Sequence, residues 1–265
     1  MNYKMVVSDM DGTLLTKDGI LTEATEEAVR QVKEAGLMFV LATGRAIQGA
    51  RKYEEQLHLS GPVITYNGAV IVNAEDDKVL FQQDLREEDS RRLLDLGSQC
   101  GTTMCIWSAQ KLYCNLDNER LKQYKEISGV EAEVIQDFEQ VLRQGITKMV
   151  WYDDADKVQD MIQKIQALPG TEVSCCTSKP TFLEIFSSKA SKGEALKKVA
   201  QLYHISREEI MAIGDGANDS TMLEYAGLGV AMANAPQVTK AAAQYITSSS
   251  EEDGVPKALK KFILK

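Results

Sequence analysis

Histidine, long apolar runs and basic blocks are scarce in this 265-residue chain, and each scarcity excludes a class of function. The two histidines, His58 and His204, are not close in sequence to any cysteine, which argues against a His/Cys metal cluster and against histidine-based catalysis. The apolar runs fall short of the roughly 18 residues that a membrane span needs. The N-terminus has no basic segment followed by a long apolar one, so we expect no signal peptide.

The cysteines and the net charge point to the same kind of protein. The five cysteines are odd in number and show no CxxC spacing, which is typical of reduced thiols in a cytoplasmic protein. The formal net charge is −9, and no basic block stands out. We therefore expect no nucleic-acid partner and no membrane partner. We also expect a monomer or weak homo-oligomer. A phosphorylated ligand would need local attraction, from a metal ion and a few placed cations.

One short stretch near the start, Ser8-Asp9-Met10-Asp11-Gly12, organises the rest of the chain. It follows the apolar run Met5–Val7, which predicts a buried strand. Two carboxylates this close repel each other, and each raises the pKa of the other unless a cation or a proton lies between them. The stretch therefore calls for a cation, a proton, or a substrate that needs one.

The order of predicted elements favours a doubly wound, Rossmann-like α/β fold. Strands predicted at 4–8, 37–42, 210–214 and 228–232 alternate with amphipathic helices, and this alternation is typical of a parallel sheet. Apolar runs at 63–66 and 69–72, separated by Asn67-Gly68, predict a hairpin with a two-residue turn. Ser191 and Glu194 predict a capping box at the head of a helix.

The pattern changes near Gln83 and returns after Phe186. We therefore expect a core domain of residues 1–82 plus 187–265 and an inserted α+β unit of residues 83–186. The Asp153–Asp156 run predicts a turn into a helix. Five side chains of the insert are candidates to line a substrate site, although a structural role is the expectation for each of them: Trp107, Tyr113, Trp151, Tyr152 and Lys179.

Polar clusters follow three of the predicted core strands, at Asp9–Gly12, Thr43–Arg45 and Asp215–Asp219. Ligands of doubly wound sheets bind outside the carboxyl ends of the strands, so the three clusters are expected to form one site. Four converging aspartates would need a hard divalent cation, for which Mg²⁺ is the expected ion. Lys192 and Thr43 are suited to phosphate oxygens, and Asp9 is the natural nucleophile of a phosphoryl-transfer site, with Asp11 as proton donor and acceptor.

The amino-acid sequences of these clusters resemble the motifs of the haloacid dehalogenase (HAD) superfamily. Asp9-Met10-Asp11-Gly12-Thr13-Leu14 is similar to its first motif, Leu41–Arg45 to its second, Ser191-Lys192-Gly193 to its third, and Gly214–Met222 to its fourth. The order, together with Ile64–Ala69, resembles the Cof-like phosphatase branch, which carries a large α/β (C2-type) cap between the second and third motifs. The resemblance spans the core, whereas the insert shares only its position in the chain and its general mixture of helices and strands. The resemblance implies that residues 83–186 are this cap, which would choose the substrate.

The resemblance implies a Mg²⁺-dependent phosphatase of small phosphorylated metabolites, such as sugar phosphates, nucleotides or cofactor phosphates, that forms an aspartyl-phosphate. Asp9 would be the nucleophile and a metal ligand. Asp11 would be the general acid/base and offer its backbone carbonyl to the metal, Asp215 would complete the metal site, and Asp219 would support it. The phosphoryl group would be held by the backbone N–H of Met10 and by Thr43, Gly44, Lys192 and Asn218.

Two other functions remain open at the level of sequence. A phosphotransferase such as a hexose-phosphate mutase shares this chemistry and differs in the group that accepts the phosphoryl. A non-enzymatic metabolite-binding protein on the same fold is the other alternative, and it is less favoured because every catalytic position is filled.

Overall fold

A computed structural model describes residues 3–264, except for the side chain of Ser178. The chain divides into two compact units, Met1–Phe81 with Ser191–Lys265, and Gln82–Ala190. We call them the core unit and the inserted unit. Within residues 3–264, no helix combines the length and the apolar character needed to cross a membrane.

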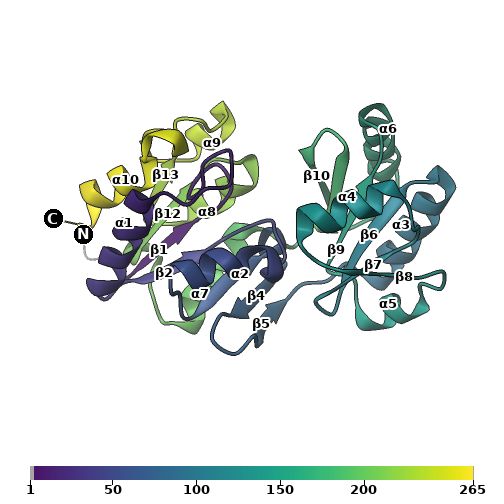
Figure 1. The fold of residues 1–265 in the computed structure, drawn as a ribbon, viewed down its shortest axis with the longest axis horizontal. Coiled ribbons are helices and arrows are strands. Elements are labelled where there is room, and N and C mark those ends of the chain that lie inside the picture. The colour runs from purple at the N-terminus through teal and green to yellow at the C-terminus, as the bar shows by residue number, and fades with distance from the viewer. Residues whose placement is uncertain (1–2, 265) are drawn as a thin grey trace. The chain divides into compact units, whose positions relative to one another are not determined.

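The core unit is built on a parallel five-stranded sheet, as the alternation of strands and helices predicted (Figure 1). Its strand order is β14-β13-β12-β1-β2, and neighbouring strands pair in parallel. The strands are β1 Met5–Ser8, β2 Met38–Leu41, β12 Ile210–Gly214, β13 Leu228–Ala231 and β14 Tyr245–Ile246. A smaller sheet in the order β3-β4-β5 consists of β3 Pro62–Thr65, β4 Val70–Asn73 and β5 Val79–Gln82.

The helices of the core unit are α1 Glu23–Glu34, α2 Ile47–Gln56, α7 Lys192–Leu202, α8 Ser220–Tyr225, α9 Gln237–Ala241 and α10 Gly254–Phe262. Two of them, α7 and α8, pack against β1 through aliphatic side chains. Met5 and Val7 of β1 share a buried cluster with Leu196 and Val199 of α7 and with Met222 of α8. This packing fixes α7 beside β1 and so carries Lys192 to the end of that strand.

The hairpin predicted around Asn67-Gly68 is present, but the prediction of a two-residue turn was wrong. A 3₁₀ turn, Tyr66–Gly68, connects β3 to β4, and both Tyr66 and Asn67 have positive φ. A Cβ added to Gly68 would lie 2.1 Å from the carbonyl oxygen of Ser191. The turn is longer because it must pass closely over the start of α7, which only glycine allows there.

The capping box predicted at Ser191 is only half formed. The Ser191 Oγ accepts a hydrogen bond from the Glu194 N–H, as expected of an N-cap. The Glu194 carboxylate instead pairs with Lys197 Nζ at 2.5 Å. Ser191 still fixes the first turn of α7, which begins at Lys192.

The inserted unit is an α+β unit with its own sheet and its own core. Its sheet order is β10-β11-β9-β6-β7-β8, antiparallel except for the parallel pair β7–β8. The strands are β6 Thr103–Ser108, β7 Lys111–Cys114, β8 Ala132–Val134, β9 Lys148–Tyr152, β10 Val173–Lys179 and β11 Phe182–Ser187, and the helices are α3 Glu87–Cys100, α4 Glu119–Ser128, α5 Glu139–Gln144 and α6 Ala155–Gln166. Leu93, Met104, Trp151 and Met161 belong to its core cluster.

Candidate active site

The first part of the site lies where β1 ends. Strand pairing on both sides of β1 continues to Ser8, and the Asp9 N–H then donates to the Ile213 carbonyl of β12 at 2.9 Å. This bond fixes the backbone of Asp9 at the carboxyl edge of the sheet. Its carboxylate is largely buried and accepts a hydrogen bond from Lys192 Nζ at 2.5 Å. The side chain of Met10, the next residue, is fully buried.

The second part is the loop that follows β12. Asp219 is fully buried, and its Oδ1 accepts from Lys192 Nζ at 2.6 Å. Its Oδ2 accepts from the backbone N–H groups of Asp215 at 3.0 Å and of Gly216 at 2.8 Å. Asp219 therefore shapes the loop that carries Asp215 and holds the ammonium that also contacts Asp9.

Buried negative charge is concentrated in this cluster. Single carboxylate oxygens of Asp9, Asp215 and Asp219 all lie within 4.8 Å of one another. Burial first, and then the charge of Asp219, raises the pKa of Asp9 well above its ordinary value. Burial also raises the pKa of Asp215, although the hydrogen bond from Thr13 opposes this. Burial alone would lower the pKa of Lys192, but Asp219 and Asp9 raise it above its ordinary value.

These residues fit a divalent cation. Three carboxylates face one ammonium, which leaves an excess of two negative charges, the charge that one divalent ion neutralises. Carboxylate oxygens are ligands that Mg²⁺ prefers. Since Asp219 already accepts three donors, Asp9 and Asp215 have the oxygen lone pairs left for an ion. Asp215 is held for this by Thr13 Oγ1, which donates to its Oδ1 at 2.8 Å.

Asp11 is separated from this cluster, although it lies only two residues after Asp9. Its two carboxylate oxygens accept from Arg45, Oδ2 from Nε at 2.9 Å and Oδ1 from Nη2 at 2.5 Å. The repulsion expected between Asp9 and Asp11 is thus relieved by two different cations, Lys192 and Arg45.

A second group of polar residues gathers around the turn after β3. A Cβ added to Gly44 would lie 2.7 Å from Asn67 Oδ1, and that oxygen accepts from Asn218 Nδ2 at 2.9 Å. Thr43 is fully buried, and its N–H donates to the Ile64 carbonyl at 2.8 Å. The structure thus brings together Gly44 and Asn218 from separate motifs, and Thr43 directly precedes Gly44 in the chain.

Four polar residues to which the sequence assigned no role contact the expected site, and one of them, Arg45, belongs to the expected Thr43–Arg45 cluster. Arg45 pairs with Asp11, Asn67 with Asn218, and Thr13 with Asp215. Asn234 Nδ2 donates to the Gly12 carbonyl at 2.9 Å and to Asp215 Oδ2 at 3.1 Å. Asn234 follows β13. Because the site forms from polar residues after the strand ends, applying the same rule to β13 would have predicted Asn234 as a site residue.

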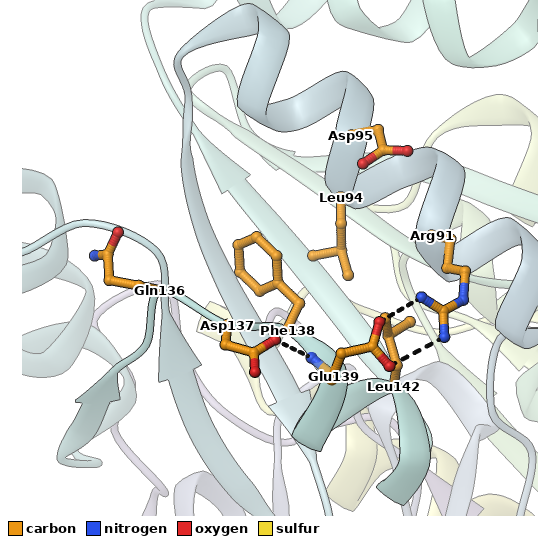
Figure 2. A pocket seen from close by; sticks show the side chains of 8 residues that line it. All are labelled: Arg91, Leu94, Asp95, Gln136, Asp137, Phe138, Glu139 and Leu142. Carbon is orange, nitrogen blue, oxygen red and sulfur yellow. Dashed lines mark hydrogen bonds and ion pairs between the residues drawn. The ribbon is translucent and has the colours of Figure 1, made fainter.

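The inserted unit contains a separate cavity of 240 Å³ between α3 and the segment leading into α5 (Figure 2). An ion pair between Arg91 Nη1 and Glu139 Oε1, 2.6 Å apart, lies at its lining, together with Phe138 and Asp95. None of the predicted catalytic, phosphate-binding or metal-binding residues lines it. We therefore assign the active site to the strand ends of the core unit rather than to this cavity.

The large aromatic side chains proposed for the insert mostly have a structural role. Trp151 and Tyr113 are buried in the core of the inserted unit, and Trp107 Nε1 donates to the Tyr124 hydroxyl at 3.0 Å. The Asp153–Asp156 run is the predicted turn into a helix: α6 begins at Ala155, and buried Asp153 pairs with Arg120 at 2.8 Å.

A parallel sheet whose carboxyl edge gathers aspartates, a buried lysine and amide groups is typical of proteins that carry out phosphoryl transfer. The family model described as haloacid dehalogenase-like hydrolase matches residues 6–259. The chain belongs to this family, and it is a phosphatase of the Cof-like branch, a phosphoric monoester hydrolase.

Three comparisons illustrate the relationship. YxeH of Bacillus subtilis is 34% identical over 269 residues, which cover 99% of each chain. The 5-amino-6-(5-phospho-D-ribitylamino)uracil phosphatase YcsE of Bacillus subtilis is 30% identical, over 100% of this chain and 97% of its own. The crystal structure of a haloacid dehalogenase-like hydrolase from Bacteroides thetaiotaomicron superimposes with a TM-score of 0.89 at 27% identity and covers 99% of this chain and 100% of its own.

Proposed function

We propose that this phosphatase is Mg²⁺-dependent and hydrolyses phosphomonoesters of small metabolites through an aspartyl-phosphate formed on Asp9. The observation that carries the proposal is the buried cluster in which Lys192 contacts Asp9 and Asp219, with Asp215 within reach of both carboxylates. Asp9, Asp215 and the backbone carbonyl of Asp11 would hold the ion. When bound, it would neutralise the carboxylates and the phosphoryl oxygens.

The first step is attack on the phosphorus by a carboxylate oxygen of Asp9. The new O–P bond forms as the bond to the leaving alkoxide breaks, and Asp11 gives that oxygen its proton. The transferred phosphoryl group would be held by Lys192, the Thr43 hydroxyl, the Asn218 amide and the backbone N–H groups of Met10 and Gly44.

The second step returns the enzyme to its starting state. Asp11, now a carboxylate, takes a proton from water, and the water oxygen attacks the phosphorus. The bond between Asp9 and the phosphorus breaks, which releases inorganic phosphate and leaves Asp11 protonated for the next cycle. We assign the choice of substrate to the inserted unit. The sequence predicts it as the cap of residues 83–186, and the compact unit spans Gln82–Ala190. YcsE, named for a pyrimidine ribityl phosphate, suggests nucleotide-like and sugar phosphates as the first compounds to test.

The test is phosphate release from a broad panel of phosphomonoesters with Mg²⁺ or with EDTA, for the parent chain and for Asp9→Asn. We expect activity that depends on Mg²⁺, and at least about a thousandfold loss in Asp9→Asn because the nucleophile is removed. Asp18→Asn changes an exposed aspartate of the same segment and serves as the control with unchanged activity.

Two results would overturn the proposal. Near-normal turnover by folded Asp9→Asn would remove Asp9 as nucleophile. Transfer of the phosphoryl group to a second sugar hydroxyl, without free phosphate, would instead indicate a hexose-phosphate mutase.

A further inference from the structure

Arg45 is the one residue of the Thr43-Gly44-Arg45 cluster to which the proposed function gives no role. Its guanidinium engages both oxygens of Asp11 in a fork, with Nε to Oδ2 at 2.9 Å and Nη2 to Oδ1 at 2.5 Å. A planar, two-point contact of this kind fixes the direction of a carboxylate as well as its position.

The arginine is held in place by contacts that do not involve Asp11. Its Nη1 donates to the Gly49 carbonyl at 3.1 Å, and its Cζ lies 5.5 Å from the centre of the Tyr53 ring. Tyr53 is itself fixed, because its hydroxyl donates to the Gly19 carbonyl at 2.9 Å. The backbone of Arg45 is fixed as well, since its N–H donates to Thr43 Oγ1 at 3.1 Å.

Asp11 is much less constrained by its surroundings. Its side chain is 54% exposed, whereas that of Asp9 is 10% exposed. Without a partner, the Asp11 carboxylate would be free to turn in solvent or to add a fourth charge to the carboxylates of Asp9, Asp215 and Asp219. A fixed arginine and an exposed aspartate mean that Arg45 places Asp11, rather than the reverse.

We propose that Arg45 is a positioning residue that aims Asp11 at the leaving group and keeps its carboxylate out of the metal cluster. The inference rests on the proposed function, in which Asp11 transfers the proton. One Asp11 oxygen can stay on Arg45 Nε while the other gives its proton to the leaving oxygen as the O–P bond breaks. Arg45 keeps its own proton throughout, so the pair passes from a net charge of +1 to a neutral ion pair as Asp11 gives up its proton.

The nature of the leaving group separates this role from a merely structural one. A 4-nitrophenolate leaves readily without a proton, whereas phenolate is a stronger base and gains more from protonation. General acid catalysis contributes about a hundredfold or more when the leaving group needs it. Misplacing Asp11 should therefore slow the hydrolysis of phenyl phosphate more than that of 4-nitrophenyl phosphate.

The experiment measures kcat/KM for both esters with the parent chain, Arg45→Met, Arg45→Lys, Asp11→Asn and the double variant Asp11→Asn/Arg45→Met. We expect Arg45→Met to lose at least about tenfold more on phenyl phosphate than on 4-nitrophenyl phosphate. Arg45→Lys keeps the charge but lacks the fork, so it should show the same selective loss to a smaller extent. In the Asp11→Asn background, Arg45→Met should cause no further loss, because the residue that it positions is gone.

Three outcomes would overturn the inference. Equal losses on both esters, or losses that multiply in the double variant, would mean that Arg45 acts on the substrate or on the fold rather than through Asp11. An Asp11→Asn variant with equal losses on both esters would remove the acid role on which the inference depends. Should Arg45→Met fail to fold, Arg45→Lys carries the comparison. Activity retained by Asp9→Asn refutes the proposed function separately, since none of these comparisons measures Asp9.

Discussion

Lys192 is the residue on which the electrostatics of the site depends. Its side chain is fully buried at the first position of α7, with Nζ 2.5 Å from Asp9 Oδ1 and 2.6 Å from Asp219 Oδ1. A buried ion pair costs desolvation of each charge, and that cost is offset only while both signs are present. The Lys192 ammonium therefore stabilises the folded core unit, and it is also suited to binding the oxygens of a phosphoryl group.

We predict that Lys192→Met destabilises the core unit by about 3 kcal/mol at neutral pH, because two buried carboxylates lose their common cation. Hydrogen exchange of the β1 and β12 amides, measured without divalent metal, reports this free energy. Lys197→Met on the same helix removes a half-exposed lysine paired with Glu194 and should change this free energy by less than about 0.5 kcal/mol. Equal protection in both variants would contradict the assignment of Lys192 as the stabilising cation.

The site residues could be predicted from sequence where the signal was local. Asp9, Thr43 and Asp215 each follow an apolar run, so their place at one edge of a parallel sheet follows from the fold class. Their partners could not be predicted in this way. The contact of Arg45 with Asp11 joins residues 34 positions apart, and that of Asn67 with Asn218 joins residues 151 apart. Such pairs depend on side-chain directions that the spacing of residues does not contain.

Among the elements, the turn between β3 and β4 illustrates how tertiary contacts override a local signal. Asn-Gly between two apolar runs favours a two-residue turn. The chain forms a longer 3₁₀ turn because the Asn67 N–H donates to the Thr43 carbonyl at 3.1 Å and Gly68 passes close to Ser191. Strand β8, Ala132–Val134, was not predicted either, because three residues with a central glutamate carry too little pattern.

Helix α3 of the inserted unit starts with a buried charge that makes stability depend on pH. Asp89 Oδ2 accepts from Arg86 Nε at 2.7 Å and from the Glu172 N–H at 3.2 Å, and its side chain is fully buried. The hydrogen bond from Arg86 is the largest cause that lowers the pKa of Asp89, and the hydrogen bond from the Glu172 N–H lowers it further. A lowered pKa in the folded state means that the stabilisation is present above the unfolded value of about 3.9 and is lost as pH falls through the lower folded value.

We therefore predict that Asp89→Asn destabilises the inserted unit by about 2 kcal/mol at pH 7, because hydrogen bonds to a charged group are lost. The difference from the parent chain should shrink as the pH falls below about 4. Both tryptophans, Trp107 and Trp151, lie in this unit, so denaturant unfolding followed by tryptophan fluorescence measures it directly. Asp95→Asn, an exposed position of the same helix, is the control, and a difference that grows toward acid pH would contradict the prediction.

At the scale of the whole molecule, the sequence changes near Gln83 from alternating strands and helices to a polar, helix-rich pattern, and the structure has two compact units, one of which is Gln82–Ala190. Each unit then closes its own hydrophobic core, one around Met5 and Leu196 and the other around Leu93 and Trp151. The reaction class follows from the core unit, because its four motifs stand at strand ends and at a helix start. The substrate does not follow from the core unit. The aromatic residues of the insert that were candidates to line a substrate site are mostly buried in the core of the inserted unit.

Separate cores imply that a ligand of the core unit stabilises that unit alone. A cation that binds only the folded aspartate cluster adds about 2.7 kcal/mol at a concentration of one hundred times its Kd. We predict that Mg²⁺ increases the hydrogen-exchange protection of β1 and β12 and leaves the denaturant midpoint of tryptophan fluorescence unchanged, because both tryptophans belong to the other unit. Asp215→Asn removes one carboxylate of the cluster and should abolish the gain in protection. An equal shift of the tryptophan transition would mean that the two units unfold as one, and a gain that persists in Asp215→Asn would place the ion elsewhere.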